Sequence, residues 1–360
     1  MKSRRVWAEI DLDAITSNLR HVRRLAGEDK GVMAIIKANA YGHGLLPVAR
    51  SLADADAFGV AMLEEAIALR EAGFDRRIVL LEGAFDAGEA MLISGYRLDV
   101  VVHHRSQLEM LEQARLSRPV DVWLKLDTGM HRLGFPDAAV ADAMRRLGNI
   151  GQVGSIFFMS HLACADEQNN PCTRDQLQCF HEATDDLAGE RSLANSAGIL
   201  GWPETRFDWV RPGIMLYGSS PLTGATAEYL DLQPVMTLET RLIAVNEHRQ
   251  GEAVGYGGDW VCPEGMPVGV AAIGYGDGYP RHLPSGTPVL VNGRPAALAG
   301  RVSMDMVTID LRSMPEAAVG DTVTLWGRGL PVDDIAGRAG TIAYELLCGI
   351  SARVSRQYRD

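Results

Sequence analysis

Lys37 closes an almost wholly apolar run of the sequence. Residues 32–36 are all apolar, and Lys37 follows them directly, ahead of the polar residues Asn39 and Tyr41. Desolvation at the end of such a run favours the neutral amine, which can attack an aldehyde and form a carbon–nitrogen double bond. Lys37 is therefore a candidate for covalent attachment of an aldehyde. A lysine at a strand end can also simply extend its ammonium group into solvent.

Polar residues follow other apolar runs at the point where each run ends. The clearest cases are Ser160-His161 and Arg211, while Lys125 and Arg132 lie within and just after a further run. If these runs are parallel strands of one barrel, their carboxyl ends meet at one mouth. Because the active sites of such barrels lie at that mouth, we expect these residues to share a site.

Two short loops have the composition of a phosphate site. They contain Asn195-Ser196 and Gly213-Ile214, and they follow the seventh and eighth predicted strands. Backbone N–H groups and small side chains in these two loops of a barrel commonly hold a phosphate. Either loop alone is more often an ordinary turn. Their joint occurrence at the expected positions favours an anion site.

The elements that must position these residues alternate between strand and helix. Short apolar runs rich in β-branched residues are separated by helical patterns such as Met62–Glu71 and Gln107–Ala114, which predicts a parallel sheet with crossover helices. A doubly wound sheet would alternate in the same way, but no G-x-G-x-x-G follows the first strand. We therefore expect a (β/α)8 TIM barrel with strands at Val32–Ile36, Phe58–Val60, Ile78–Leu81, Leu98–Val102, Val120–Leu126, Ser155–Met159, Arg191–Ala194 and Phe207–Val210.

The last third of the chain has a different pattern. From Gln233 onward, short alternating runs are broken by glycine and proline. Asn292-Gly293 between two such runs is a strong signal for a hairpin. This region predicts a mostly β domain, and its expected elements include strands at Pro288–Val291, Pro295–Leu298 and Ala352–Tyr358 and a helical piece near Tyr344–Leu347.

The join between the two domains is predicted where periodicity disappears. Ser219–Leu232 contains proline, glycine, threonine and alanine without a repeating pattern. We therefore expect the barrel in residues 1–232 and the C-terminal β domain in residues 233–360. A first strand at about residues 4–10 is expected to pack on the β domain.

Composition and charge exclude several classes of protein. The chain has 360 residues, of which 47% are hydrophobic, and 35 basic and 46 acidic residues give a net charge of −11. It has no basic run with interleaved aromatic residues that could follow a nucleic acid, and no apolar segment that could cross a bilayer. Acidic residues soon follow the basic N-terminus, where a signal peptide needs an apolar stretch. Five cysteines, odd in number and sparse, do not suggest a disulfide framework, so we expect a cytoplasmic protein.

A metal site is the first competing interpretation. His161, Cys164, Cys172, Cys179 and His181 are close in sequence, but their spacing fits no zinc pattern. A barrel metallohydrolase would need a His-x-His at an early strand end, and the chain has none there. We therefore expect no bound metal.

Six further motifs lie in order along the chain at Ala34–Gly44, Leu124–Gly134, Arg211–Gly218, Gly255–Gly258, Gly274–Arg281 and Arg301–Met306. Together, and in this order, they resemble the bacterial alanine racemases, which are pyridoxal-phosphate enzymes of fold type III. The resemblance implies a barrel followed by a β domain, a homodimer, and interconversion of L-alanine and D-alanine by two bases. It leaves open whether D-alanine serves peptidoglycan and the cell wall or whether alanine is catabolised.

The resemblance also implies roles for individual residues. Lys37 would carry pyridoxal 5′-phosphate and act on one face of the reacting carbon, and Tyr256 of the other subunit would act on the opposite face. Since a tyrosine hydroxyl is a poor base at neutral pH, it needs neighbours such as His161 and Arg211. Arg211 would meet the pyridine nitrogen and can only donate there. The other residues implied to bind the cofactor are Tyr41, His161, Asn195, Ser196, Gly213, Ile214 and Tyr344.

The remaining implied residues concern the substrate. Arg132 and Met304 would bind its carboxylate, Met304 from the other subunit, and Tyr275 would lie at the entrance. Lys125 matches a lysine that is carbamylated in members of the family, although a strand lysine near an aspartate needs no modification. Asp305 matches a further site residue without a derived role.

Two other pyridoxal-phosphate proteins remain as alternatives. A cofactor carrier would resemble a single barrel and would need neither Tyr256 nor the β domain. A decarboxylase with a barrel and a β domain would show a cysteine-containing motif and acidic contacts for a long basic substrate, and we find no match to these.

Overall fold

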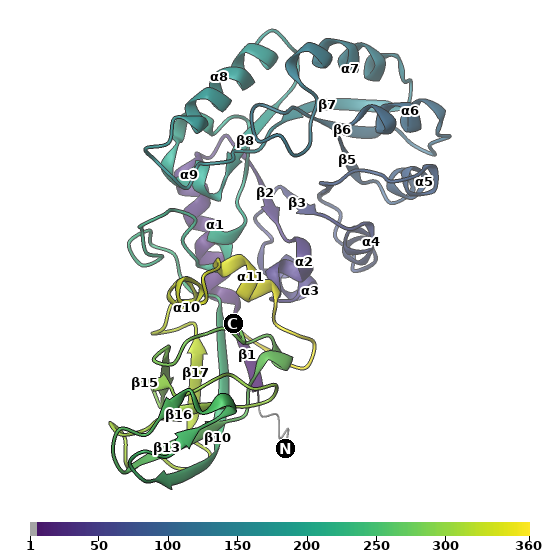
Figure 1. Cartoon of the computed structure of the whole chain (residues 1–360). Coiled ribbons are helices and arrows are strands. Elements are labelled where there is room, and N and C mark those ends of the chain that lie inside the picture. Colours follow the sequence, from purple (N-terminus) through teal and green to yellow (C-terminus); the bar gives the residue numbers. More distant parts are fainter. Residues whose placement is uncertain (1–5) are drawn as a thin grey trace.

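The first half of the molecule is a closed barrel of eight parallel strands. The computed structural model describes residues 6–360, and Figure 1 shows the barrel above a separate region of sheet. The predicted TIM barrel is confirmed, and predicted and observed bounds differ only at the strand ends. The barrel strands are β2 (Gly31–Ile35), β3 (Ala57–Val60), β4 (Arg77–Leu80), β5 (Asp99–Val102), β6 (Val120–Lys125), β7 (Val153–Met159), β8 (Arg191–Asn195) and β9 (Trp209–Arg211).

These strands form because they are apolar on both faces. Phe58, for example, pairs with Ala34 on one side and Ile78 on the other, and all three side chains are fully buried. Parallel strands need helical crossovers, which cover the outer face of the barrel. The helices that follow barrel strands or precede the first one are α1 (Leu12–Ala26), α2 (Lys37–Tyr41), α3 (Leu45–Ser51), α4 (Leu63–Glu71), α5 (Ala87–Gly95), α6 (Arg105–Gln113), α7 (Asp137–Asn149), α8 (Cys172–Thr184) and α9 (Ser196–Gly201).

The second half of the molecule is built on one eight-stranded sheet. Its strand order is β13-β16-β15-β14-β17-β10-β1-β18, and β11 and β12 form a separate pair. The predicted hairpin is present as β14 and β15. The strands are β1 (Val6–Asp11), β10 (Met236–His248), β11 (Ala253–Val254), β12 (Trp260–Val261), β13 (Met266–Ala271), β14 (Pro288–Val291), β15 (Arg294–Leu298), β16 (Val307–Asp310), β17 (Thr322–Trp326) and β18 (Ser355–Arg359).

Both ends of the chain lie in this sheet. β1 pairs antiparallel with β10 and parallel with β18, so the strand expected at about residues 4–10 is part of the β region. Residues 4 and 5 lie outside the described residues. The described part of residues 219–235 carries no helix or strand, and the exact division at residue 232 stays a prediction.

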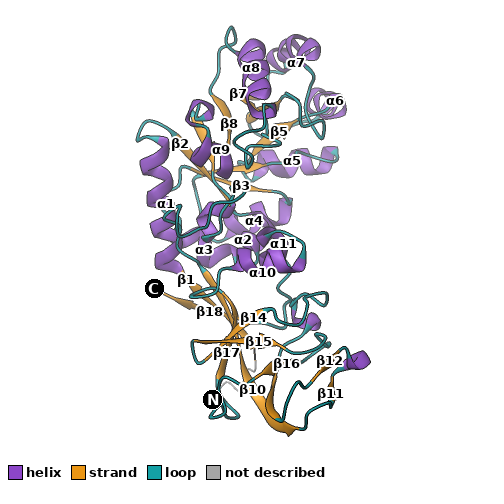
Figure 2. Ribbon diagram, turned by 60° about the vertical axis from the view of Figure 1, so that its left-hand side comes forward, coloured by secondary structure: helices purple, strands orange, loops and turns teal. Residues whose placement is uncertain are grey.

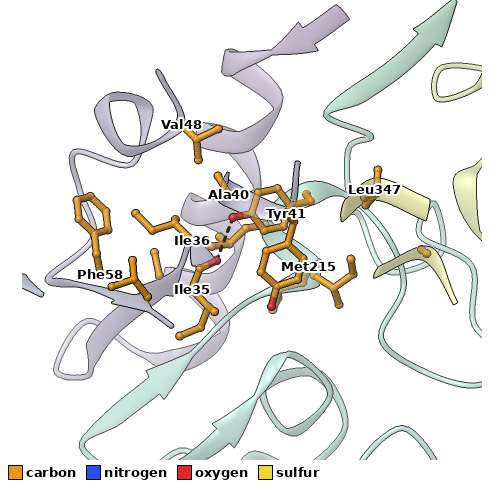
Figure 3. Packing of buried hydrophobic residues seen from close by; sticks show 14 of the residues in the cluster. Ile35, Ile36, Ala40, Tyr41, Val48, Phe58, Met215 and Leu347 are labelled. Atoms are coloured by element: carbon orange, nitrogen blue, oxygen red, sulfur yellow. Dashed lines mark hydrogen bonds between the residues drawn. The ribbon is translucent and has the colours of Figure 1, made fainter. Parts of the chain in front are cut away.

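The chain returns to the barrel shortly before its end. Helices α10 (Val332–Ala339) and α11 (Ala343–Cys348) lie between the sheet and the barrel in Figures 1 and 2. The sequence predicted α11 but missed α10. Leu347 of α11 packs with Ile35, Tyr41 and Met215 in one buried cluster (Figure 3), so α11 belongs to the wall of the barrel mouth.

Two further observations limit what the molecule contains. Among residues 6–360, no helix is long and apolar enough to span a membrane. The same residues hold no cluster of three or more histidine, cysteine or acidic side chains suited to a metal ion.

Candidate active site

A cavity of about 450 Å³ opens at the carboxyl ends of the barrel strands. It lies where the barrel rule places an active site. Each polar residue reaches it because its strand ends there. The predicted residues that line it are Lys37, Tyr41, Lys125, Arg132, His161, Asn195, Ser196, Arg211, Gly213, Ile214 and Tyr344.

Arg211 is the most deeply placed cation of the cavity. It is 5% exposed, and its guanidinium donates to Ser192 Oγ at 2.6 Å and to the carbonyl oxygen of Leu193 at 3.3 Å. Burial lowers the pKa of Arg211 to about 10, so it stays charged at neutral pH. No carboxylate within the described residues forms an ion pair with it. A buried cation without a counter-charge favours binding of an anion or an electron-rich acceptor.

Lys125 shows how strongly positive the cavity is. Burial, followed by the charges of Arg211, Arg132 and Lys37, lowers the pKa of Lys125 to about 8. An appreciable fraction of its amine is therefore neutral at neutral pH. A neutral amine is nucleophilic, so Lys125 is chemically suited to modification.

His161 is neutral in this environment. Burial, then the charges of Arg211 and Lys125, holds the pKa of His161 well below its usual value. Its Nδ1 lies 3.5 Å from an Arg211 nitrogen. Of the two residues expected to assist a tyrosine base, only Arg211 therefore carries a positive charge.

The loop at Gly213 closes one corner of the cavity. Ser196 Oγ accepts a hydrogen bond from the backbone N–H of Gly213 at 2.8 Å. A Cβ on Gly213 would lie 2.7 Å from Tyr41 Oη, so only glycine fits. Burial raises the pKa of Tyr344 to about 12 and also raises that of Tyr41, so both hydroxyls stay protonated and can donate to an anion.

The backbone after Lys37 adopts an unusual conformation. Ala38, Asn39, Ala40 and Tyr41 have φ of 53°, 55°, 53° and 50°, which makes α2 a left-handed turn. L-residues pay roughly 1–2 kcal/mol each for this conformation. His43 Nδ1 donates to the carbonyl oxygens of Ala40 and Tyr41, at 3.0 and 2.8 Å. These contacts stabilise the turn, and no local sequence pattern predicts them.

Several cavity residues were missed from sequence. Glu82, Leu133, Met159 and Cys348 line the same cavity. Glu82 lies two residues beyond the end of β4, so its place at a strand end was the signal that could have found it. Cys348 ends α11, far from the barrel strands in sequence, and nothing local in the sequence points to its place in the cavity.

Four predicted residues do not line this chain's own cavity. Tyr256, Tyr275, Met304 and Asp305 lie on the β region, and the first three side chains are 70%, 42% and 53% exposed. Two of their loops are joined, because Tyr275 N donates to the carbonyl oxygen of Ser303 at 3.0 Å. Arg353 forms ion pairs with Asp305 at 2.5 Å and with Asp277 at 3.3 Å. The four residues therefore lie on ordered loops and face solvent in the single chain.

The fold and the cavity together define a class of protein: a barrel with a lysine amine after its first strand and cavity-lining loops after its last two, followed by an antiparallel β domain. The family model described as "Alanine racemase, N-terminal domain" matches residues 10–221, and the one described as "Alanine racemase, C-terminal domain" matches residues 235–358. The chain therefore belongs to the alanine racemase family, a family of isomerases.

Similar proteins cover almost the whole chain. The alanine racemase of Nitrosococcus oceani is 54% identical over 97% of this chain and 98% of its own, and that of Thioalkalivibrio sulfidiphilus is 56% identical over 98% of each. The crystal structure of biosynthetic alanine racemase from Pseudomonas aeruginosa has a TM-score of 0.96 at 49% identity, covering 99% of this chain and 100% of that one. The alanine racemase structure from Acinetobacter baumannii has a TM-score of 0.93 at 40% identity, covering 99% of this chain and 100% of that one.

Proposed function

We propose that this chain interconverts L-alanine and D-alanine with pyridoxal 5′-phosphate attached to Lys37, as a homodimer in which each subunit completes the other's site. The observation that carries the proposal is the cavity in which Lys37 lies with Arg211, Arg132 and the Ser196–Gly213 loop. It offers an amine for the aldehyde and several positive charges for anionic groups.

The residues present fit this cofactor. The phosphate would be held by the protonated hydroxyls of Tyr41 and Tyr344, by Ser196, and by the backbone at Gly213 and Ile214, with His161 and Asn195 nearby. Because Gly213 has no Cβ, the loop backbone lies close to the Tyr41 hydroxyl, and the N–H groups of Gly213 and Met215 converge on Ser196 Oγ. When bound, pyridoxal phosphate acidifies the Cα–H of an amino acid joined to it.

Arg211 would face the pyridine nitrogen of the cofactor. A guanidinium has donors only, so it would leave that nitrogen unprotonated. Its hydrogen bonds to Ser192 and Leu193 fix the guanidinium in place. By donating there, Arg211 would favour return of the proton at Cα over side reactions.

Racemisation needs proton exchange on both faces of one carbon. Lys37 would remove or return the proton on one face, and Tyr256 of the partner subunit would do so on the other. The charge of Arg211 would stabilise the deprotonated hydroxyl, because His161 is neutral. Arg132 and the partner's Met304 would hold the substrate carboxylate, with the partner's Tyr275 at the entrance and the partner's Asp305 beside it.

Lys125 would be carbamylated in the working enzyme. Its lowered pKa, about 8, supplies the neutral amine that reacts with carbon dioxide. The resulting negative group would lie among Arg132, Arg211 and Lys37, the charges that lower the pKa of the free amine. It would then hold Arg132 in place. Intact mass measured with and without carbon dioxide tests this modification.

Two exposed apolar surfaces support the dimer. Met62 and Phe85, which follow barrel strands at the mouth, are 54% and 72% exposed. Tyr256 and Met304 on the β region are exposed to a similar extent. Exposed apolar side chains on the loops of the barrel mouth and on the β region suit an isologous pair in which each barrel mouth meets the partner's β region.

The decisive experiment is borohydride reduction of the purified protein followed by peptide mapping, with optical rotation of added L-alanine as the activity assay. We expect the label on Lys37 and complete racemisation. Label on another residue contradicts the site. Release of carbon dioxide without racemisation would indicate a decarboxylase, and a bound cofactor without either reaction would indicate a carrier.

We further propose a cytoplasmic role in supplying D-alanine for peptidoglycan, with alanine catabolism as the alternative. The Pseudomonas aeruginosa structure is described as that of a biosynthetic alanine racemase, which supports the first role. Deletion of the gene tests it, since a biosynthetic role predicts that growth then requires D-alanine.

A further inference from the structure

The loop that follows the Lys37 turn is held by the last strand of the chain. Arg356 of β18 donates from Nε to the carbonyl oxygen of Gly42 at 2.5 Å. The hydroxyl of Tyr358 donates to the carbonyl oxygen of His43 at 3.1 Å. The partners are 314 and 315 residues apart, so this contact forms only when the two ends of the chain come together.

The loop and the strand fit without room for side chains between them. A Cβ on Gly42 would lie 2.1 Å from the carbonyl oxygen of Leu347, and a Cβ on Gly44 would lie 2.1 Å from Tyr358 Oη. Both glycines have positive φ, 81° and 104°. The two glycines therefore allow the backbone to approach α11 and β18 closely.

The same contacts reach the cavity from two sides. His43 lies between the Arg356–Tyr358 contacts and the left-handed turn, since its Nδ1 donates to the carbonyl oxygens of Ala40 and Tyr41. Arg356 also donates from Nη2 to the carbonyl oxygen of Ile350 at 3.2 Å, just beyond α11. Because α11 carries Tyr344 and Cys348 to the cavity wall, Arg356 connects that wall to the turn.

We infer that Arg356 and Tyr358 are positioning residues that hold the turn after Lys37 through the carbonyl groups of Gly42 and His43. The inference rests on the proposed function only in that Lys37 and Tyr41 bind the cofactor. Without these hydrogen bonds the left-handed turn has fewer partners, so Tyr41 would move relative to Gly213. The variants should then lose more cofactor affinity than free energy of unfolding of the whole protein.

Hydrogen exchange of residues 37–45 and titration with pyridoxal phosphate test the inference in Arg356→Met and Tyr358→Phe. We expect at least about tenfold faster exchange and about tenfold weaker cofactor binding for Arg356→Met, since the charged hydrogen bonds to the carbonyl oxygens of Gly42 and Ile350 are both lost. Tyr358→Phe should give a smaller change in the same direction, and Arg356→Lys should restore part of the loss. Gln357→Ala is the matched control, because Gln357 lies between them on β18 with an exposed side chain.

Two results would overturn the inference. One is unchanged exchange in residues 37–45 in both variants. The other is faster exchange throughout the β region with unaltered cofactor affinity, which is the signature of a merely structural role. Failure of the proposed function is separate, since wild-type protein would then fail to take up the cofactor at Lys37 while exchange still reports whether β18 holds the turn.

Discussion

The charge of a single residue in the cavity depends both on its surroundings and on the chemistry of its own side chain. Arg211 and Lys125 are both buried cations, yet Arg211 remains charged while the pKa of Lys125 falls to about 8. A guanidinium starts from a much higher pKa than an amine, so the same burial leaves it protonated. The cavity therefore keeps the charge of Arg211 and makes Lys125 reactive.

Replacement of Gly213 by alanine should weaken cofactor binding at least about tenfold, because the new Cβ would lie 2.7 Å from Tyr41 Oη and displace the loop or the tyrosine. Absorbance titration with pyridoxal phosphate measures the effect. Tyr41→Phe is the informative partner, since it removes the clashing oxygen and leaves Tyr41 Cζ, 3.4 Å from that Cβ, as the nearest contact. If the effects of Gly213→Ala and Tyr41→Phe on the free energy of cofactor binding are simply additive in the double variant, the steric explanation is wrong.

Lys125→Met should stabilise the protein without carbon dioxide and cofactor by roughly 1–3 kcal/mol at pH 7, because the buried ammonium loses hydration in the native state. The native pKa is about 8 and the unfolded value about 10.4, so the unfolded state binds more protons between them. The free-energy penalty of the buried ammonium in the wild-type native state therefore falls as pH rises through this window. Above it, the stability of Lys125→Met relative to wild type should no longer be increased. Chemical denaturation at several pH values measures this. An advantage that persists above the window would contradict the burial argument.

At the scale of elements, the short α2 turn is the part of the site with the least favourable backbone conformation. Four consecutive residues with φ near +50° are unfavourable for L-amino acids. Hydrogen bonds from His43 and the packing of Tyr41 against Tyr217, with ring centroids 4.6 Å apart, offset this cost. The turn carries Tyr41 away from the strand direction and under the Gly213 loop.

Ala38 tests the cost of the turn because its side chain is exposed and packs little. We expect Ala38→Val to lower the free energy of unfolding by about 1 kcal/mol or more, since a β-branched residue is disfavoured at positive φ. Ala38→Gly should cause no comparable loss. Urea denaturation of the three proteins gives the order of their free energies of unfolding. An Ala38→Val variant as stable as wild type would show that the turn can change its backbone conformation without loss of stability.

At the scale of the whole molecule, the two ends of the chain meet beside the site. β1 and β18 are neighbours in one sheet, and α11 brings Tyr344 into the barrel mouth. Tyr256, Tyr275 and Met304 meanwhile point to solvent from the β region. Under the proposed function, one chain would thus hold both halves of a site without bringing them together.

Mixing inactive Lys37→Ala and Tyr256→Phe subunits should restore activity if the halves combine between subunits. Random exchange makes about half of the dimers mixed, and each mixed dimer has one intact site, so about a quarter of wild-type activity is expected. Racemisation after unfolding and refolding the mixture measures this. Either variant refolded alone is the control, and absence of recovery despite mixed dimers would place Tyr256 outside the partner's site.

The amino-acid sequence alone determined the barrel, the hairpin and the strand-end residues. Those features are local: apolar runs must be buried, and a residue that follows a parallel strand must lie at the mouth. This is why the sequence could predict that Lys37, Ser196 and Arg211 lie at the mouth, where they line the cavity. The missed helix α10 lies in a region whose pattern was dominated by strands.

Only the tertiary structure decided what depends on neighbours distant in sequence. The pKa of Lys125 is lowered by burial and by charges from other strands. The hydrogen bond from Arg356 to the carbonyl oxygen of Gly42 joins segments near opposite ends of the chain. The left-handed turn after Lys37 could not be predicted from sequence, because Ala38–Tyr41 contains no glycine that would indicate positive φ. Burial, charge and close approach act through space, so they follow from the fold and not from the order of residues.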